Sequence, residues 1–230
     1  MPPTPFSEED KIRILLWCDR HCCLCGEPCG TNIICHHIKQ EGNDTGNIEN
    51  AIPLCLNCHG EINRYNIEHP VGTDYKIKEI KARRDQIYEK YTRHLVPPLN
   101  YSPFQRDGDY TENHLDFVRF QIAHLGDSLP VRITIEAKII LGGEDRGLVP
   151  DTNGYYSGET EWNLNPRRTV VGGFHLPADV ANSDLELKIE LRVTIIDQYG
   201  RKHRELPQCW IYIRERNLWN LEPRQFTNWN

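Results

Sequence analysis

The sequence contains no run of about 18 apolar residues, which is the length that a membrane-spanning helix requires. Its first ten residues have no basic residue and no apolar core, and this argues against a secretory signal. There is also no internal repeat and no low-complexity tract. These absences lead us to expect a cytoplasmic protein that does not insert into a membrane.

Positive charge is not in excess either. The chain has 27 Lys and Arg residues against 33 Asp and Glu residues, with a formal net charge of −6. Dedicated duplex-binding proteins usually have a basic excess, because phosphate contacts supply most of their non-specific affinity. We therefore expect any nucleic-acid-binding surface to be local, and we do not expect tight stand-alone binding of DNA.

Cysteine, by contrast, is concentrated in one segment. Eight of the nine cysteines lie within residues 18–58, and two Cys-x-x-Cys pairs have the spacing of zinc knuckles. Four thiolates from two such pairs can surround one zinc ion tetrahedrally. In a chain without a secretory signal, this distribution favours metal binding over disulfides. We therefore predict a structural zinc ion whose ligands are Cys22, Cys25, Cys55 and Cys58.

The remaining cysteines are less easily assigned. Cys23 and Cys29 are near neighbours of the first pair, so the choice of ligands within that knuckle stays open. The others are predicted to be small packing residues: Cys18, Cys35 and Cys209.

Helices are predicted on both sides of the zinc segment. Ser7 followed by three acidic residues is typical of a helix start. That helix should pack on the zinc unit through Ile12, Leu15 and Leu16. Residues 33–38 predict a short strand, and another helix begins near His59. A further helix is predicted at residues 76–94, with an apolar face of Ile77, Ile80, Ile87 and Tyr91.

A change of periodicity marks a second domain. Prolines at positions 97, 98 and 103 predict a linker at residues 96–103, between a domain of residues 1–95 and one of residues 104–230. In the second domain apolar and polar residues alternate and turn signals separate the runs, which predicts an antiparallel β-sandwich. The segment 120–126 weakly resembles the opening of immunoglobulin-like sandwiches. We therefore expect the α+β fold class, with an all-β accessory or sensor domain at the C-terminal side.

Polar residues lie between and directly after the two cysteine pairs. They are His36-His37 in the predicted strand, Asn50 before the second pair, His59 directly after it, and Asn63. In this order and spacing, residues 20–95 resemble the HNH endonuclease family. The resemblance implies an N-terminal ββα-metal domain, in which a β-hairpin and a helix hold one catalytic metal ion, together with a structural zinc ion and flanking helices.

The resemblance also implies a role for each of these residues. His37 would be the general base that takes a proton from water, a task that suits the near-neutral titration of histidine. His36, on the other side of the strand, would bind the catalytic cation. His59 and Asn63 are four residues apart, so that one helix face would present both to the same cation. Asn50 would brace the loop and orient the imidazole of His37.

The implied cation would stabilise charge on the phosphate and on the leaving oxygen. Two histidines and one asparagine place no carboxylate among its ligands, and imidazole favours softer divalent ions over magnesium. Its identity therefore stays open among Mg²⁺, Mn²⁺, Ni²⁺ and Zn²⁺. Candidate phosphate contacts are Lys39, Arg64, Lys76, Lys78, Lys81, Arg83 and Arg84.

The function that the resemblance implies is hydrolysis of phosphodiester bonds by a metal-dependent endonuclease, with DNA as the expected substrate. By analogy with other nuclease-plus-sensor chains, we expect a regulated anti-phage or restriction-type effector. The alternative is a zinc-stapled module that binds nucleic acid or protein without turnover, with the sandwich mediating the interaction. The sandwich offers a possible surface for a protein partner or ligand, and the oligomeric state stays open.

Overall fold

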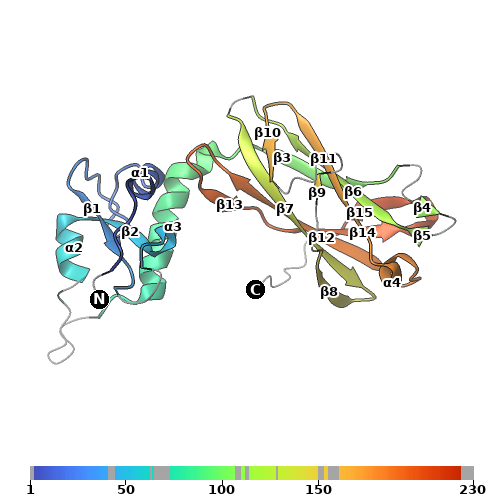
Figure 1. Cartoon of the computed structure of the whole chain (residues 1–230), viewed down its shortest axis with the longest axis horizontal. Helices are drawn as coiled ribbons and strands as arrows, with labels where there is room; N and C mark the ends of the chain where they lie inside the picture. Colours follow the sequence, from blue (N-terminus) through green and yellow to red (C-terminus); the bar gives the residue numbers. More distant parts are fainter. Residues whose placement is uncertain are drawn as a thin grey trace. The chain divides into compact units, whose positions relative to one another are not determined.

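The fold is described from a computed structural model, which covers residues 3–40, 45–62, 64, 73–106, 110–111, 114–127, 129–149, 153–154 and 161–223. The chain divides into two compact units, which we describe separately. Unit 1 comprises Met1–His94 together with Tyr199–Arg201, and unit 2 comprises Leu95–Gln198 together with Lys202–Asn230. Antiparallel sheets dominate the described residues and helices are few (Figure 1).

Unit 1 is built around a two-stranded antiparallel sheet. Its elements in chain order are α1 (Glu8–Trp17), β1 (Ile33–His37), a 3-10 turn (Ile48–Asn50), β2 (Ala51–Cys55), α2 (Leu56–Ile62), α3 (Ile77–Thr92) and a second 3-10 turn (Arg93–Leu95). The register of the hairpin pairs Ile33 with Cys55 and His37 with Ala51. Because α2 begins at the residue after β2, the hairpin leads directly into a helix.

The start of α1 follows from its sequence. The hydroxyl of Ser7 accepts the backbone N–H of Asp10 at 3.1 Å, as the predicted N-cap requires. The predicted apolar stripe is wrong, however, because Ile12 is 59% exposed and Leu16 is 41% exposed. Ile14 and Trp17 are buried in their place. They lie on the helix face that continues into the buried cysteines after α1, and this tertiary context outweighs the simple count of apolar residues.

Helix α3 buries only part of its predicted face, which includes the buried Ile80 and the half-buried Ile87. Its buried residues recur every fourth position and are Ile80, Arg84, Tyr88 and Thr92. Ile77, expected on the apolar face, is 44% exposed. The inward guanidinium of Arg84 lies in hydrogen-bond contact with backbone carbonyls, which is how a protein buries this group without a large desolvation cost.

Unit 2 consists of β-strands with one short helix. Its elements are β3 (Leu99–Phe104), β4 (Tyr110–Thr111), β5 (His114–Leu115), β6 (Phe117–His124), β7 (Val131–Leu141), β8 (Glu144–Leu148), β9 (Asn153–Gly154), β10 (Glu161–Leu164), β11 (Thr169–His175), α4 (Ala178–Ala181), β12 (Leu187–Ile196), β13 (Lys202–Arg204), β14 (Gln208–Ile213), a 3-10 turn (Arg214–Arg216) and β15 (Leu218–Leu221).

Two antiparallel sheets enclose the core of unit 2. One has the order β10-β7-β12-β14-β15, with β13 beside β12 and β8 beside β7, and the other has the order β3-β6-β11-β9. Every second residue of β12 points into one buried cluster, from Leu187 to Ile195. Phe120 and Phe174 enter the same cluster from the other sheet. The alternating pattern in the sequence therefore corresponds to the buried faces of paired sheets, as predicted.

The segment expected to be an interdomain linker, residues 96–103, is part of unit 2. Leu99–Phe104 forms β3, which pairs with β6, and the side chain of Tyr101 is 5% exposed. Pro103 is tolerated there because β3 pairs with a neighbour on one side only, at the edge of its sheet. Among the described residues, no helix is long and apolar enough to span a membrane.

Candidate metal centre and histidine site

The four predicted zinc ligands come from two places in unit 1. Cys22 and Cys25 lie in the loop after α1, while Cys55 ends β2 and Cys58 lies in α2. Gly26 follows the first pair with a φ of +80°, a conformation that favours glycine, and its N–H donates to the carbonyl of Cys22 at 2.8 Å. The N–H of Cys23 donates to the carbonyl of Pro53 at 2.8 Å, which ties the first knuckle to β2.

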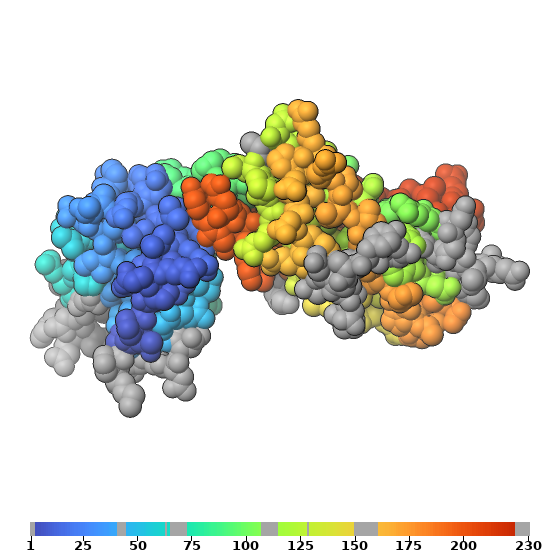
Figure 2. Space-filling model, turned by 45° about the horizontal axis from the view of Figure 1, so that its top comes forward, coloured from blue at the N-terminus to red at the C-terminus, as the bar shows by residue number. Residues whose placement is uncertain are grey.

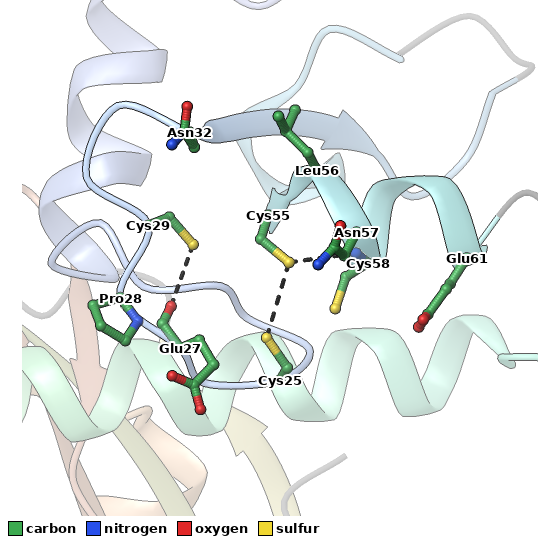
Figure 3. A pocket seen from close by; sticks show the side chains of 10 residues that line it. All are labelled: Cys25, Glu27, Pro28, Cys29, Asn32, Cys55, Leu56, Asn57, Cys58 and Glu61. Atoms are coloured by element: carbon green, nitrogen blue, oxygen red, sulfur yellow. Dashed lines mark hydrogen bonds between the residues drawn. The ribbon is translucent and has the colours of Figure 1, made fainter.

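The sulfur geometry fits one tetrahedral ion. The four Sγ atoms all lie within 4.8 Å of one another, and those of Cys25 and Cys55 are 4.0 Å apart. A zinc–sulfur distance of about 2.3 Å in a tetrahedron implies sulfur separations of about 3.8 Å. Figure 3 shows the sulfur atoms of Cys25, Cys55 and Cys58 directed toward the same space. The cluster can hold a structural metal ion such as zinc.

The pKa values of the thiols also indicate that the cluster requires a cation. Burial opposes ionisation of Cys22, but backbone N–H groups, those of Cys25 and Cys55 first, lower its pKa to about 7. Burial raises the pKa of Cys58, and hydrogen bonds with the thiols of Cys55 and Cys25 raise it further. One thiolate therefore forms readily, whereas several together require a cation beside them.

The structure also resolves which neighbouring cysteines stand apart from the cluster. Cys23 is 1% exposed within the core of unit 1, and burial strongly raises its pKa. The thiol of Cys29 donates to the carbonyl of Glu27 at 3.2 Å, and Cys29 lines the pocket that Cys25, Cys55 and Cys58 also line (Figure 3). Cys18 is fully buried, as a packing residue should be. Cys35 and Cys209 are half-buried.

The predicted histidines come from β1 and α2. His36 and His37 are the last two residues of β1, and His59 lies in α2. The rings of His36 and His59 meet edge to face, with centroids 5.0 Å apart. Burial, then the neighbouring imidazoles of His59 and His37, lowers the pKa of His36 to about 4. The ring of His36 is therefore neutral at physiological pH, and its Nε2 atom accepts a hydrogen bond from the amide Nε2 of Gln40 at 3.3 Å, which a metal ion bound at that atom would replace. Asn63 lies outside the described residues.

His37 has different contacts from His36. Its ring stacks on Phe6, with centroids 4.1 Å apart and an interplanar angle of 14°. Its Nε2 atom lies 2.9 Å from the carbonyl oxygen of Thr4. Sequence reasoning missed both residues. Phe6 stands out only as the single aromatic residue of a proline-rich segment before the first helix.

Asn50 connects the two ends of the loop after β1. Its Oδ1 accepts the N–H of Lys39 at 2.8 Å, and its Nδ2 donates to the carbonyls of Lys39 and Thr45 at 2.9 Å each. The side chain is 9% exposed, so these bonds are shielded from water. Among the described residues, its amide makes no direct bond with the imidazole of His37.

The basic residues expected to contact phosphate separate into two groups. Arg84 is 5% exposed and donates to the carbonyl of Glu49 at 2.7 Å. Its predicted contact with phosphate is therefore wrong, because the side chain is buried in unit 1 and binds the backbone. Arg83 is exposed and pairs with Glu79 at 3.3 Å. The side chains of the others reach solvent: Lys39, Arg64, Lys76, Lys78 and Lys81.

No family model matches the chain, and no curated protein matches it. Among solved structures, it is similar to a Bordetella pertussis protein assigned as ApaA, with 14% identity, 48% of this chain and 85% of that chain covered, and a TM-score of 0.30. It is also similar to the structural-genomics target SoR45, with 12% identity, 49% and 83% covered, and a TM-score of 0.31. At these TM-scores neither likeness carries an argument about this chain.

Proposed function

We propose that this protein is a metal-dependent endonuclease of the HNH type, which hydrolyses phosphodiester bonds in nucleic acid, with DNA as the substrate. The observation that carries the proposal is the β1–β2 hairpin running directly into α2, which brings the ring of His36 against that of His59, while His37 follows His36 as the last residue of β1. This order of two strands and a helix is the one expected of a ββα-metal nuclease.

In this proposal the zinc centre has a structural role. Its ligands come from the loop after α1, from the end of β2 and from α2, so the ion would join these three segments. Structural zinc ions contribute directly to folding free energy. The hairpin and helix that carry the histidines would thus be held in a fixed relation.

The chemistry would be divided among the residues that are not cysteine. His37 would accept a proton from the attacking water, and Asn50 would hold the loop that follows β1 in place. His36, His59 and Asn63 would hold a divalent cation, which supplies charge stabilisation at the phosphate and the leaving oxygen. The neutral state of His36 fits this use. A nitrogen-rich set favours Ni²⁺, Zn²⁺ or Mn²⁺ over Mg²⁺.

The test is a nicking assay on supercoiled plasmid, with single-stranded DNA and RNA run in parallel, in the presence of Mg²⁺, Mn²⁺, Ni²⁺ or Zn²⁺. We expect His37→Ala to lower the rate by about 10²–10⁴-fold, which is the range for loss of a general base. His94→Ala is the matched control, because His94 is exposed in the 3-10 turn after α3 and takes no part in the proposed site.

Zinc content is measured for every variant, so that loss of folding is separated from loss of chemistry. Absence of cleavage with all four ions, or an unchanged rate in His37→Ala, would overturn the proposal. Retained binding of nucleic acid without cleavage would instead favour a non-catalytic zinc-stapled module.

A further inference from the structure

The segment before α1 lies against the histidine that we propose as the general base. Phe6 stacks almost parallel on the imidazole of His37, and the Nε2 atom of His37 is 2.9 Å from the carbonyl oxygen of Thr4. A carbonyl oxygen can only accept a hydrogen bond, so Nε2 must carry the hydrogen. In the neutral ring, Nδ1 then has the free lone pair.

This segment is part of the folded unit and does not behave as a loose tail. Phe6 is 4% exposed and belongs to the core of unit 1. The N–H of Thr4 donates to the hydroxyl of Thr45 at 2.8 Å, and Thr45 is 4% exposed. A side chain at Gly46 would come within 3.1 Å of Thr4, so the two segments are in close contact. In Figure 2 the N-terminal residues, drawn in dark blue, lie on the surface of unit 1.

The same contacts link Asn50 to His37 indirectly. The amide of Asn50 donates to the carbonyl of Thr45, the hydroxyl of Thr45 accepts the N–H of Thr4, and the carbonyl of Thr4 contacts His37. These three hydrogen bonds, joined through the covalent atoms of Thr45 and Thr4, form a continuous path from Asn50 to the ring of His37. The orienting role expected of Asn50 would act on His37 along this path, without a direct bond between them.

We propose that Thr4 and Phe6 are positioning residues for His37. The carbonyl of Thr4 selects the tautomer with hydrogen on Nε2, and the ring of Phe6 fixes the imidazole plane. Nδ1, which has no hydrogen-bond partner among the described residues, is thereby presented to a water molecule as the proton acceptor. The catalytic consequence rests on the proposed nuclease function, whereas the tautomer and the ring orientation do not.

The first experiment reads the tautomer without any substrate. In the ¹⁵N-labelled full chain, the side-chain nitrogen shifts of His37 should report hydrogen on Nε2. Deletion of residues 1–5 removes the carbonyl of Thr4 and should give a mixture of tautomers. Thr45→Val, which removes the acceptor for the N–H of Thr4 but leaves His37 untouched, should shift the mixture in the same direction. Thr4→Ala keeps the carbonyl and should match the wild type.

The second experiment measures cleavage. We expect the deletion and Phe6→Ala to lower kcat by about 10- to 100-fold with little change in KM, because misplacement of a reacting group by about 1 Å has effects of this size. Phe6→Tyr keeps an aromatic ring and should restore most of the rate. Zinc content checks that each variant is folded, and Thr45→Val replaces the deletion if the latter does not fold.

A wild-type tautomer with hydrogen on Nδ1 would overturn the proposal, and so would a Thr45→Val variant with unchanged tautomer and kcat. If the tautomer depends on Thr4 and Thr45 as expected but no nucleic acid is cleaved with any ion, the positioning role stands and the nuclease function fails. The two proposals can therefore be refuted separately.

Discussion

Replacement of Arg84 by alanine is the perturbation for which the structure gives the most definite magnitude. The side chain is 5% exposed, and its Nη1 donates to the backbone carbonyls of Glu49 at 2.7 Å and Ala51 at 3.4 Å. It also forms ion pairs with the carboxylates of Asp85 at 2.7 Å and Glu49 at 3.5 Å. Arg84 thus connects α3 to the segment that begins β2.

The size of each contribution shows which contact matters. The carboxylates of Glu49 and Asp85 are 73% and 57% exposed, so their ion pairs with Arg84 are worth about 0–1 kcal/mol. Hydrogen bonds from a charged donor to a buried carbonyl contribute about 1.5–3 kcal/mol each, with the longer one at Ala51 near or below the lower limit. We therefore expect Arg84→Ala to destabilise unit 1 by about 3 kcal/mol, mainly through the carbonyls.

Hydrogen exchange measured by mass spectrometry suits this test, because it reports the opening free energy of individual peptides. For peptides from β2 and α3, a loss of about 3 kcal/mol corresponds to exchange about 100-fold faster. Arg83→Ala is the matched control on the same helix, since Arg83 is exposed and forms its ion pair with the exposed Glu79. It should change the exchange by less than about threefold.

Neutralising the ion pair separately completes the test. Asp85→Asn should cost less than about 1 kcal/mol, since it removes only an exposed partner. If Asp85→Asn were as damaging as Arg84→Ala, the assignment of the energy to the carbonyls would be wrong. If Arg84→Ala changed the opening free energy by less than about 1 kcal/mol, the reasoning from burial would fail as well.

Three further outcomes are expected. Cys25→Ser should abolish stoichiometric zinc binding while Cys29→Ser retains it, as measured by metal analysis of the purified chain; loss of zinc in Cys29→Ser alone would contradict the ligand set. Asn50→Ala should lower the free energy of unfolding by about 1–3 kcal/mol and speed hydrogen exchange at the Lys39 amide, because three shielded hydrogen bonds are lost. An unchanged exchange rate at that amide would refute the bracing role of Asn50. Gly173→Ala should destabilise unit 2 by about 1–3 kcal/mol in urea unfolding, because the added Cβ would lie 2.7 Å from the backbone oxygen of Val118. If the variant were as stable as the wild type, the backbone of β6 would have to shift to accommodate the methyl group, and the reasoning would be wrong.

Much of the fold follows from local patterns. The period of two in the sequence of β12 predicts which of its side chains enter the core of unit 2, since the pleat of a strand sends alternate side chains to opposite faces. The spacing of each Cys-x-x-Cys pair lets both thiols reach one point, so the spacing alone predicts that each pair supplies two thiols to the four-cysteine cluster. The helical patterns were less informative, since α1 buries Ile14 and Trp17 instead of the predicted Ile12 and Leu16, and α3 buries Ile80 as predicted but also Arg84. On short helices, a few apolar residues do not outweigh the surfaces available for packing.

The candidate site shows the same division. The sequence was sufficient to predict His36 and His37 in a strand and His59 near the start of a helix. The structure agrees, because β1 ends at His37 and α2 begins directly after β2. Their catalytic roles stay predictions. The contact of Phe6 with His37 joins residues 31 positions apart in the sequence, and no local pattern encodes it.

Spacing and periodicity were therefore sufficient for the four-cysteine cluster, for the paired sheets of unit 2 and for the histidine pair in β1. Three features could be seen only in the folded chain. They are the burial of Arg84, the pairing of Leu99–Phe104 with β6, and the contacts of His37 with Thr4 and Phe6. The reason is physical. Periodicity specifies which face of an element is apolar, whereas a buried guanidinium or an oriented imidazole depends on carbonyl groups that distant segments bring within reach.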